Sequence, residues 1–286
     1  MKKCIVATVC CLLLSSLPVG GFAQTASLPA SEHQAKTVGM LRMEQTAAIS
    51  IQKDAAKQIG RNRKVVFYDS LQPLVRDLSK GKLDRAALPE FTVDYLRGRD
   101  PEGPLVLSVQ SGARYFSAFS LATYQNKDLR DKLNTALTDM AHDGTTNKLV
   151  KLYVTGLPGD VEPAKVEIPL QKDVPAVKVL VTGSLPPLDF LDKDGQPAGF
   201  NALFMREIGK RTGLNIQFVR ADVKTAFNKL KAHEADIIFA YSVTTVVDNN
   251  TIVSSYDDGD DPSVNLTQPY LEVPVRLLKL QGASRR

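Results

Sequence analysis

Short apolar runs typical of buried strands alternate with amphipathic helical segments along most of the chain. This alternation restricts the fold more than any other feature, because strands separated by helices of about ten to fifteen residues are typical of α/β proteins with largely parallel sheets. The alternation stops over residues 155–176, where four prolines, two glycines and no helical period predict a linker. The sequence therefore predicts an α/β fold in two blocks.

Apolar periodicity divides both blocks into individual elements. The predicted strands are residues 37–41, 64–68, 83–88, 105–109, 115–122, 177–181, 214–219, 237–240 and 273–280. The predicted helices are residues 46–59, 70–78, 90–97, 128–141, 146–153, 202–212 and 223–232. Residues 246–266 are polar and contribute no predicted element.

The first 23 residues have the layout of a secretory signal peptide, with a basic start, an apolar run and small residues before a cleavage point after Ala23. We favour this reading over a retained membrane anchor, because the apolar run is too short to span a bilayer. All three cysteines, Cys4, Cys10 and Cys11, lie in this segment. A cleaved, exported chain would therefore contain no disulfide.

Several classes of function receive no support from the residues. Cleavage would lower the formal net charge from +5 to +3, and no basic run interleaved with aromatics points to nucleic acid. The histidines are scattered, and no nucleophile elbow, phosphate loop or dinucleotide fingerprint is present.

Asp189 and Asp192 flank an apolar strand and fit a turn or cap role better than acid–base work. The acidic run 257–261 is interpreted as a solvated loop rather than a Ca²⁺ site. We therefore expect neither an enzyme nor a cofactor.

Motifs in the second block identify a family. Pro186-Pro187, residues 192–195, Gly199-Phe200, residues 236–238 and Pro269-Tyr270 follow one another in the order seen in the first lobe of the extracytoplasmic solute-binding proteins of family 3, the polar amino acid type. Residues 64–96 of the first block are similar to the second lobe of that family, and residues 115–154 are similar to its returning hinge strand and terminal helices. The resemblance implies a two-lobed type II periplasmic-binding-protein-like fold with its lobes in reversed order.

Reversed lobe order is the pattern of a circular permutation. The resemblance then implies a second-lobe-like domain over residues 37–114, a hinge strand with terminal helices over 115–154, the linker 155–176, and a first-lobe-like domain with its closing hinge strand over 177–280. A linker of this length can join the original ends, because loop closure costs little extra per residue. The alternative is a fragment of two tandem domains; we favour permutation because each lobe is present once and complete.

The ligand site implied by the resemblance departs from the family. The residues that fall at its binding positions are Leu185, Leu188, Tyr241, Ser242 and Val243 from the first lobe and Gln45, Thr46 and Glu90 from the second. Tyr241 could offer an aromatic face or simply pack, and Glu90 could replace the family's amine-binding acid or be a first-turn acid. Asp248 falls near the family's carboxylate-clamping arginine, and Pro89 falls at its amine-binding acid. Arg42, Arg114 or Arg220 could replace the arginine, although the sequence places none of them.

The resemblance implies an extracytoplasmic or periplasmic monomer that captures a small polar or amino-acid-like solute for the membrane permease of an ABC importer, with no nucleic acid partner. The alternative is a sensor or interaction module that uses the same fold with altered or lost solute binding. A third possibility, an enzyme on this fold, would need an acid or base placed between the lobes, and the sequence shows none.

Overall fold

The computed structural model describes residues 37–42, 64–108, 114–156, 163, 165–248, 251–256 and 261–282. The predicted signal peptide, the predicted helix 46–59 and the site candidates Gln45 and Thr46 lie outside the described residues. Within the described ranges, no helix combines the length and the apolar character that a membrane crossing would require.

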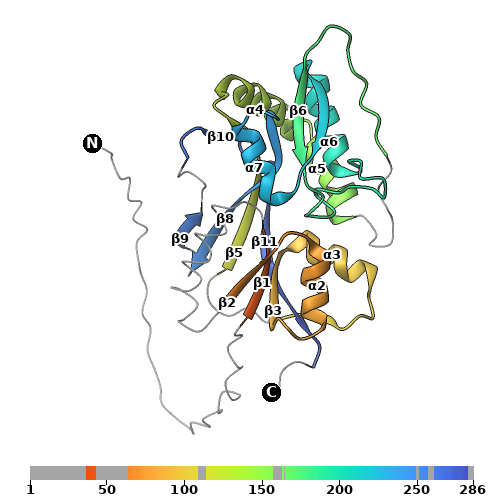
Figure 1. The fold of residues 1–286 in the computed structure, drawn as a ribbon, viewed down its shortest axis with the longest axis vertical. Coiled ribbons are helices and arrows are strands. Elements are labelled where there is room, and N and C mark those ends of the chain that lie inside the picture. The colour runs from red at the N-terminus through yellow and green to blue at the C-terminus, as the bar shows by residue number, and fades with distance from the viewer. Residues whose placement is uncertain are drawn as a thin grey trace, which may run out of the picture. The chain divides into compact units, whose positions relative to one another are not determined.

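Two α/β lobes share one path of hydrogen-bonded strands, in the order β2-β1-β3-β11-β5-β8-β6-β7 (Figure 1). We name the half with β1, β2 and β3 the N-lobe and the half with β6, β7 and β8 the C-lobe. In each lobe three strands run parallel or mainly so, and helices connect them. The predicted two-lobed α/β fold is confirmed.

The N-lobe is built from the first block of the sequence. Strand β1 lies between β2 and β3 and is parallel to both, and β11 pairs with β3 and β4 in the antiparallel sense. The elements are β1 (Thr37–Leu41), β2 (Lys64–Tyr68), α2 (Leu71–Ser79), β3 (Arg85–Pro89), α3 (Glu90–Arg99) and β4 (Leu105–Leu107).

The C-lobe combines the second block with helices from the end of the first. Helices α4 and α5 pack on α6. The elements from the first block are α4 (Lys127–His142), α5 (Thr145–Val150) and the π-helical turn η1 (Lys151–Thr155). Those from the second block are β6 (Ala176–Val181), α6 (Phe200–Thr212), β7 (Asn215–Arg220), α7 (Val223–Lys231), β8 (Ile237–Asp248), β9 (Thr251–Tyr256) and β10 (Val264–Leu266).

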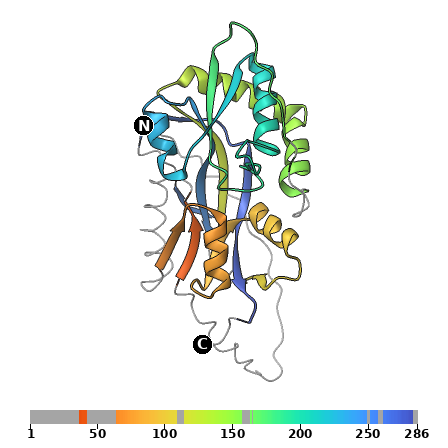
Figure 2. The same ribbon diagram turned by 45° about the vertical axis from the view of Figure 1, so that its right-hand side comes forward.

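Two strands, β5 (Arg114–Tyr124) and β11 (Leu271–Leu280), join the lobes (Figure 2). Residues 271–274 of β11 pair with β5 in the C-lobe, whereas residues 275–278 pair with β3 in the N-lobe. The hinge strands predicted over 115–122 and 273–280 fall within these two strands. Strand β5 starts one residue earlier than predicted, where it pairs with β8, and ends two residues later, where it pairs with β10. Strand β11 starts two residues earlier, where it pairs with β5.

One hydrophobic core runs through both lobes and includes Leu74 and Leu78 from α2 as well as Phe200 and Phe204 from α6. In the C-lobe, Tyr270 stacks against Phe204 with ring centroids 4.8 Å apart and donates its hydroxyl to the carbonyl oxygen of Phe239. Burial, and then the charge of Asp189, raise the pKa of the Tyr270 hydroxyl well above its ordinary value. The Pro-Tyr motif thus supplies core packing.

The motif Gly199-Phe200 begins helix α6. Gly199 has φ +70° and ψ −128°, a conformation that is essentially restricted to glycine. Phe200 then points into the core with none of its surface exposed. The predicted helix 202–212 therefore starts two residues earlier than its apolar period alone indicates.

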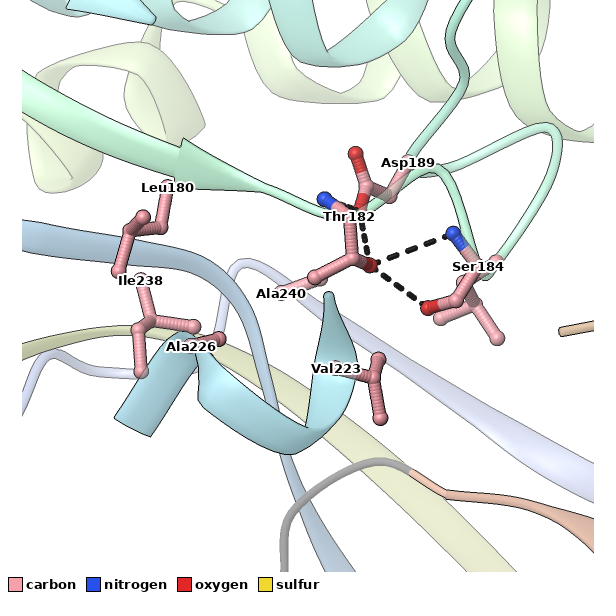
Figure 3. A pocket seen from close by; sticks show the side chains of 9 residues that line it. Leu180, Thr182, Ser184, Asp189, Val223, Ala226, Ile238 and Ala240 are labelled. Atoms are coloured by element: carbon pink, nitrogen blue, oxygen red, sulfur yellow. Dashed lines mark hydrogen bonds between the residues drawn. The ribbon is translucent and has the colours of Figure 1, made fainter. Parts of the chain in front are cut away.

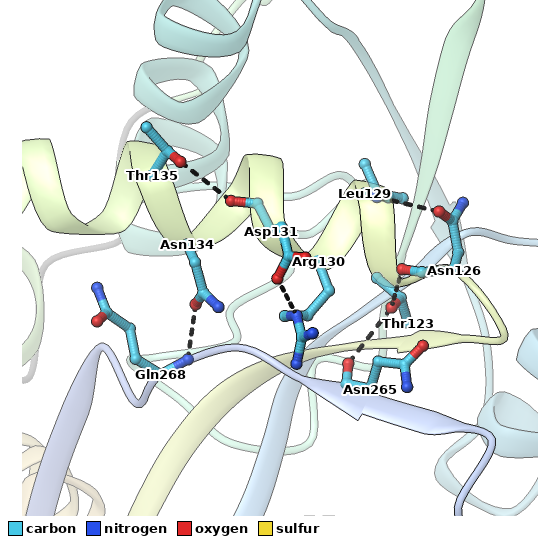
Figure 4. Close-up of polar contacts among 9 residues, drawn as sticks. All are labelled: Thr123, Asn126, Leu129, Arg130, Asp131, Asn134, Thr135, Asn265 and Gln268. Atoms are coloured by element: carbon cyan, nitrogen blue, oxygen red, sulfur yellow. Dashed lines mark hydrogen bonds and ion pairs between the residues drawn. The ribbon is translucent and has the colours of Figure 1, made fainter.

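Helix α4 is fastened to the strands of the C-lobe by polar contacts (Figure 4). Asn126 caps its N-terminus by accepting a hydrogen bond from the backbone N–H of Leu129 at 3.0 Å. Asn134, further along the helix, accepts from the backbone N–H of Gln268 at 2.8 Å, just before β11. The hydroxyl of Thr123 donates to the backbone carbonyls of Asn126 and Asn265. The segment similar to the family's terminal helices is thereby held on the C-lobe.

Two regions differ from the sequence-based expectation. The polar stretch 246–266 contains β9, β10 and the last residues of β8, because β8 continues beyond the predicted end at residue 240 as a run of β-branched residues along β5. The predicted helix 146–153 is divided into α5 and η1.

Apart from its first residue, Thr155 of η1, and its last, Ala176 of β6, the described part of the predicted linker contains no helix or strand, but it is held to the C-lobe. Asn215 accepts from the backbone N–H of Gln171 and donates to the carbonyls of Gln171 and Val174, at 2.7 to 2.8 Å.

Candidate functional site

The loop that follows β6 is organised around the buried carboxylate of Asp189, which is 2% exposed. Asp189 Oδ2 accepts hydrogen bonds from the backbone N–H and the hydroxyl of Thr182, both at 2.8 Å, and from the N–H of Gly183 at 3.0 Å. Its other oxygen accepts from the side-chain amide of Asn201 on α6 at 3.0 Å. The turn role predicted for Asp189 fits this arrangement, and the loop is fixed by buried, satisfied contacts.

This loop forms one wall of a cavity at the carboxyl end of β6, beside the first residues of β8 (Figure 3). Helix α7 closes another wall through Val223 and Ala226. The residues that line the cavity are Leu180, Thr182, Ser184, Leu185, Asp189, Val223, Ala226, Ile238 and Ala240. In open α/β sheets, ligands bind outside the carboxyl ends of the strands, so the cavity lies where a small solute is expected.

Hydroxyl groups provide most of the polar chemistry of the cavity. The hydroxyls of Thr182 and Ser184 lie 2.7 Å apart, and Thr182 Oγ1 also accepts from the backbone N–H of Ser184 at 3.2 Å. The carboxylate of Asp189 is already engaged by four donors. The cavity therefore suits a small neutral or apolar group that Ser184 can orient, because the one proton of the Thr182 hydroxyl is donated to Asp189.

The predicted first-lobe site residues occupy different environments. Leu185 lines the cavity, whereas Leu188 has no exposed surface and belongs to the hydrophobic core. Tyr241, also without exposed surface, packs in a smaller cluster with Ala226 and Leu230, and Val243 packs against that cluster. Ser242 is 2% exposed, and its hydroxyl has no hydrogen-bond partner within the described part of the chain.

Glu90, the predicted site residue of the N-lobe, is engaged by a cation. Two nitrogens of the Arg276 guanidinium on β11 bond to one carboxylate oxygen of Glu90, at 2.8 and 2.5 Å. Glu90 is also the first-turn acid of α3. A ligand amine could use this carboxylate only in competition with Arg276.

The candidate replacements for the family's arginine are spread over three places. Arg42, directly after β1, is paired with Asp69 at 2.9 Å, and Asp69 is also paired with Lys224 of α7 at 2.7 Å. Arg114 begins β5, opposite Val247 of β8. Arg220 ends β7 and lies beside Gly195. Asp248 lies at the end of β8, in the hairpin with β9.

The structure gives no support for a metal centre: in the ranges that it describes, no three metal-ligating side chains come together. Asp261, the last residue of the acidic run, forms an ion pair with Lys231 at 3.0 Å, and residues 257–260 of that run lie outside the described ranges.

The sequence predicted a turn or cap role for Asp189 and assigned no site role to Thr182, Ser184, Val223 or Ala226, although all five line the cavity. These residues could have been found from their positions relative to the predicted strands. Each follows or faces the carboxyl end of a predicted parallel strand, which is where α/β proteins place their ligands.

Comparison with known proteins shows a family resemblance in the second block of the chain. Residues 177–255 match the family described as bacterial extracellular solute-binding proteins, family 3. The matched segment covers just over a quarter of the chain and contains the loop after β6 and the cavity. The resemblance predicted for the second block is confirmed over this segment.

Solved structures that resemble the chain include further binding proteins. The periplasmic aliphatic sulphonate binding protein SsuA from Escherichia coli is 9% identical, with a TM-score of 0.39 over 87% of this chain and 65% of that chain. A variant of ArgBP from T. maritima is 14% identical, with a TM-score of 0.37 over 85% and 80%. The GluR0 ligand-binding core from Nostoc punctiforme is 12% identical, with a TM-score of 0.36 over 86% and 85%. At such scores these likenesses add nothing to the family match. We found no match among the curated proteins.

Proposed function

We propose that the chain is an extracytoplasmic solute-binding protein that captures a small polar or amino-acid-like solute between its lobes and delivers it to the permease of an ABC importer. The observation that carries this proposal is the cavity on the C-lobe between the loop after β6, the first residues of β8 and α7, at the carboxyl end of β6. It lies within the segment that matches the solute-binding family.

The ligand site is not the standard one of the family. The C-lobe contributes hydroxyls and apolar side chains, and Glu90 of the N-lobe is held by Arg276. We propose that Leu185 and the hydroxyls of Thr182 and Ser184 contact the solute, and that Gln45 and Thr46 contribute from the N-lobe. The wall is then supported from behind by side chains packed in or against the core clusters, namely Leu188, Tyr241 and Val243. Ser242, which is buried next to Tyr241 in the chain, belongs to the same support.

Export and lobe order belong to the same proposal. Residues 1–23 act as a cleavable signal peptide, so the mature chain works outside the cytoplasm as a monomer. The lobes follow one another in permuted order, with residues 155–176 joining ends that in the family lie on one lobe. The packing of α5 on α6 and the hydrogen bonds from Asn215 to the linker are consistent with this joint.

The test is a thermal-shift screen of amino acids and other small polar solutes against the chain and two leucine variants. Ala240→Leu fills the cavity, whereas Ala176→Leu adds the same atoms at the exposed amino end of β6. We expect at least one solute to raise the melting temperature of the wild type and of Ala176→Leu but not of Ala240→Leu.

If no solute shifts the wild type, the proposal fails and the alternative of a sensor or interaction module takes its place. If all three proteins respond equally, the chain binds solutes elsewhere and the cavity assignment is wrong.

A further inference from the structure

The lobes are joined by an ion pair at a distance from the strands that connect them. Asp69 directly follows β2, and Lys224 lies in the first turn of α7, directly after β7. Strands β2 and β7 are the two outermost strands of the path that runs through both lobes. Their following residues nevertheless meet at 2.7 Å between Lys224 Nζ and Asp69 Oδ2.

Asp69 is held on both sides. Arg42 of the N-lobe donates to Asp69 Oδ1 at 2.9 Å, while Lys224 of the C-lobe contacts Oδ2. Arg42 is fixed in turn by its backbone N–H, which donates to the carbonyl of Tyr68 at 2.7 Å. The aspartate is therefore positioned by its own lobe to receive the cation of the other.

The ion pair lies far from the strands about which the lobes would rotate. Each outer strand is three strands away from the nearest crossing strand, β11 or β5, which corresponds to about 14 Å at a spacing of about 4.8 Å per strand. A rotation about the crossing strands moves the outer edges most. The pair is thus among the first contacts that an opening of the lobes would break.

We propose that Arg42, Asp69 and Lys224 form a latch that holds the N-lobe and the C-lobe closed in the absence of solute. All three side chains are partly exposed: Arg42 is 25%, Asp69 45% and Lys224 57% accessible. An exposed ion pair of this kind contributes little free energy, so the latch favours the closed arrangement of the lobes but still allows them to open. It sets the fraction of closed protein that solute binding then increases.

The latch is tested by measuring the distance between the lobes without solute. Spin labels at Gln72 on α2 and Asn228 on α7, both exposed, report on the outer edges in a full chain whose three cysteines are replaced by alanine. We expect Lys224→Met to lower the ratio of closed to open protein about 1.5- to 5-fold at low salt, and Lys224→Glu to lower it further. About 0.5 M NaCl should remove most of the difference, because exposed pairs are screened.

The matched control is Arg211→Met. Arg211 forms an ion pair of 2.6 Å with Asp143, and both residues belong to the C-lobe. This variant should leave the interlobe distances unchanged. The latch is refuted if wild type and Lys224→Glu give the same distance distribution at low salt, or if Arg211→Met opens the lobes as much as Lys224→Met. Neither result bears on whether the chain binds a solute, which the thermal-shift screen tests separately.

Discussion

Two of the contacts between the N-lobe and the C-lobe differ in character. Near the crossing strands, Phe91 of α3 packs on Phe119 of β5 with ring centroids 5.6 Å apart, and both side chains are at most 1% exposed. At the outer edge, Asp69 and Lys224 meet as a partly exposed ion pair. The first contact buries a large apolar area and resists separation, whereas the second is weak and sensitive to salt. The difference indicates a fixed pivot beside the crossing strands and a reversible closure at the rim.

The buried aromatic contact between the lobes can be removed by substituting Phe119. Phe119→Ala deletes a buried ring in the core that both lobes share, and we expect a loss of about 3 to 5 kcal/mol in the free energy of unfolding. Urea denaturation followed by circular dichroism measures this loss. Phe119→Leu, which keeps most of the volume, should cost clearly less. A loss below about 1 kcal/mol for the alanine variant would show that the ring contact does not hold the lobes together.

Two carboxylates extend the comparison between buried and exposed contacts. Asp189 is buried and accepts four hydrogen bonds, whereas Asp69 is 45% exposed and paired with two cations. Because Asp189→Ala leaves buried donors unsatisfied, we expect it to lower the free energy of unfolding by about 2 to 4 kcal/mol. Asp69→Ala should lower the free energy of unfolding by less than about 1 kcal/mol. The same denaturation experiment measures both. Equal losses would contradict the distinction between a fixed cavity wall and a weak latch.

The smallest expected effect concerns titration within one lobe. Hydrogen bonds from the hydroxyl and the backbone N–H of Thr145, followed by the Arg211 guanidinium, lower the pKa of Asp143 from 3.8 to about 2. The lowered pKa means that the ionised form is favoured by folding, so this contribution is present above pH 4 and is lost as the pH falls through 2. An NMR titration of the carboxyl carbon should show this pKa, and Arg211→Met should raise it only in part. A pKa at its ordinary value in the wild type would contradict the contacts.

The latch aspartate behaves differently from Asp143. Burial tends to raise the pKa of Asp69, but hydrogen bonds from Lys224 and Arg42 outweigh this tendency and leave the pKa below its ordinary value. Opening of the lobes would move Lys224 away from Asp69, so the pKa of Asp69 would be lowered less in the open protein. Closure is therefore expected to be lost at acidic pH, as Asp69 takes up a proton and releases the cation of the other lobe.

Much of the fold follows from the sequence because each lobe repeats one simple pattern. Apolar runs such as residues 64–68 and 177–181 form parallel strands, and the helices that follow end at or near the predicted residues. The hairpin of β8 and β9 escaped prediction, since its stability comes from pairing with β5, which lies more than a hundred residues away in the chain. The polar composition of residues 246–266 does not by itself indicate that a distant strand pairs with them.

The site was only partly predictable, for a related reason. Leu185 could be found through its place beside the Pro-Pro motif, and it does line the cavity. Val223 and Ala226 belong to a helix whose apolar face reads as ordinary core, and only the arrangement of three elements turns that face toward a cavity. Likewise, the pairing of Glu90 with Arg276 joins residues 186 positions apart, so the sequence could suggest the carboxylate but not its partner.

We proposed above that a solute is captured on the wall formed by the loop after β6. Titration of the ¹⁵N-labelled chain with pools of amino acids and other small polar solutes tests it most directly. We predict that at least one pool shifts the amide signals of Thr182, Gly183 and Ser184 in the wild type, and that Ala240→Leu abolishes these shifts. Shifts confined to residues outside the cavity, or no shift with any pool, would contradict the claim.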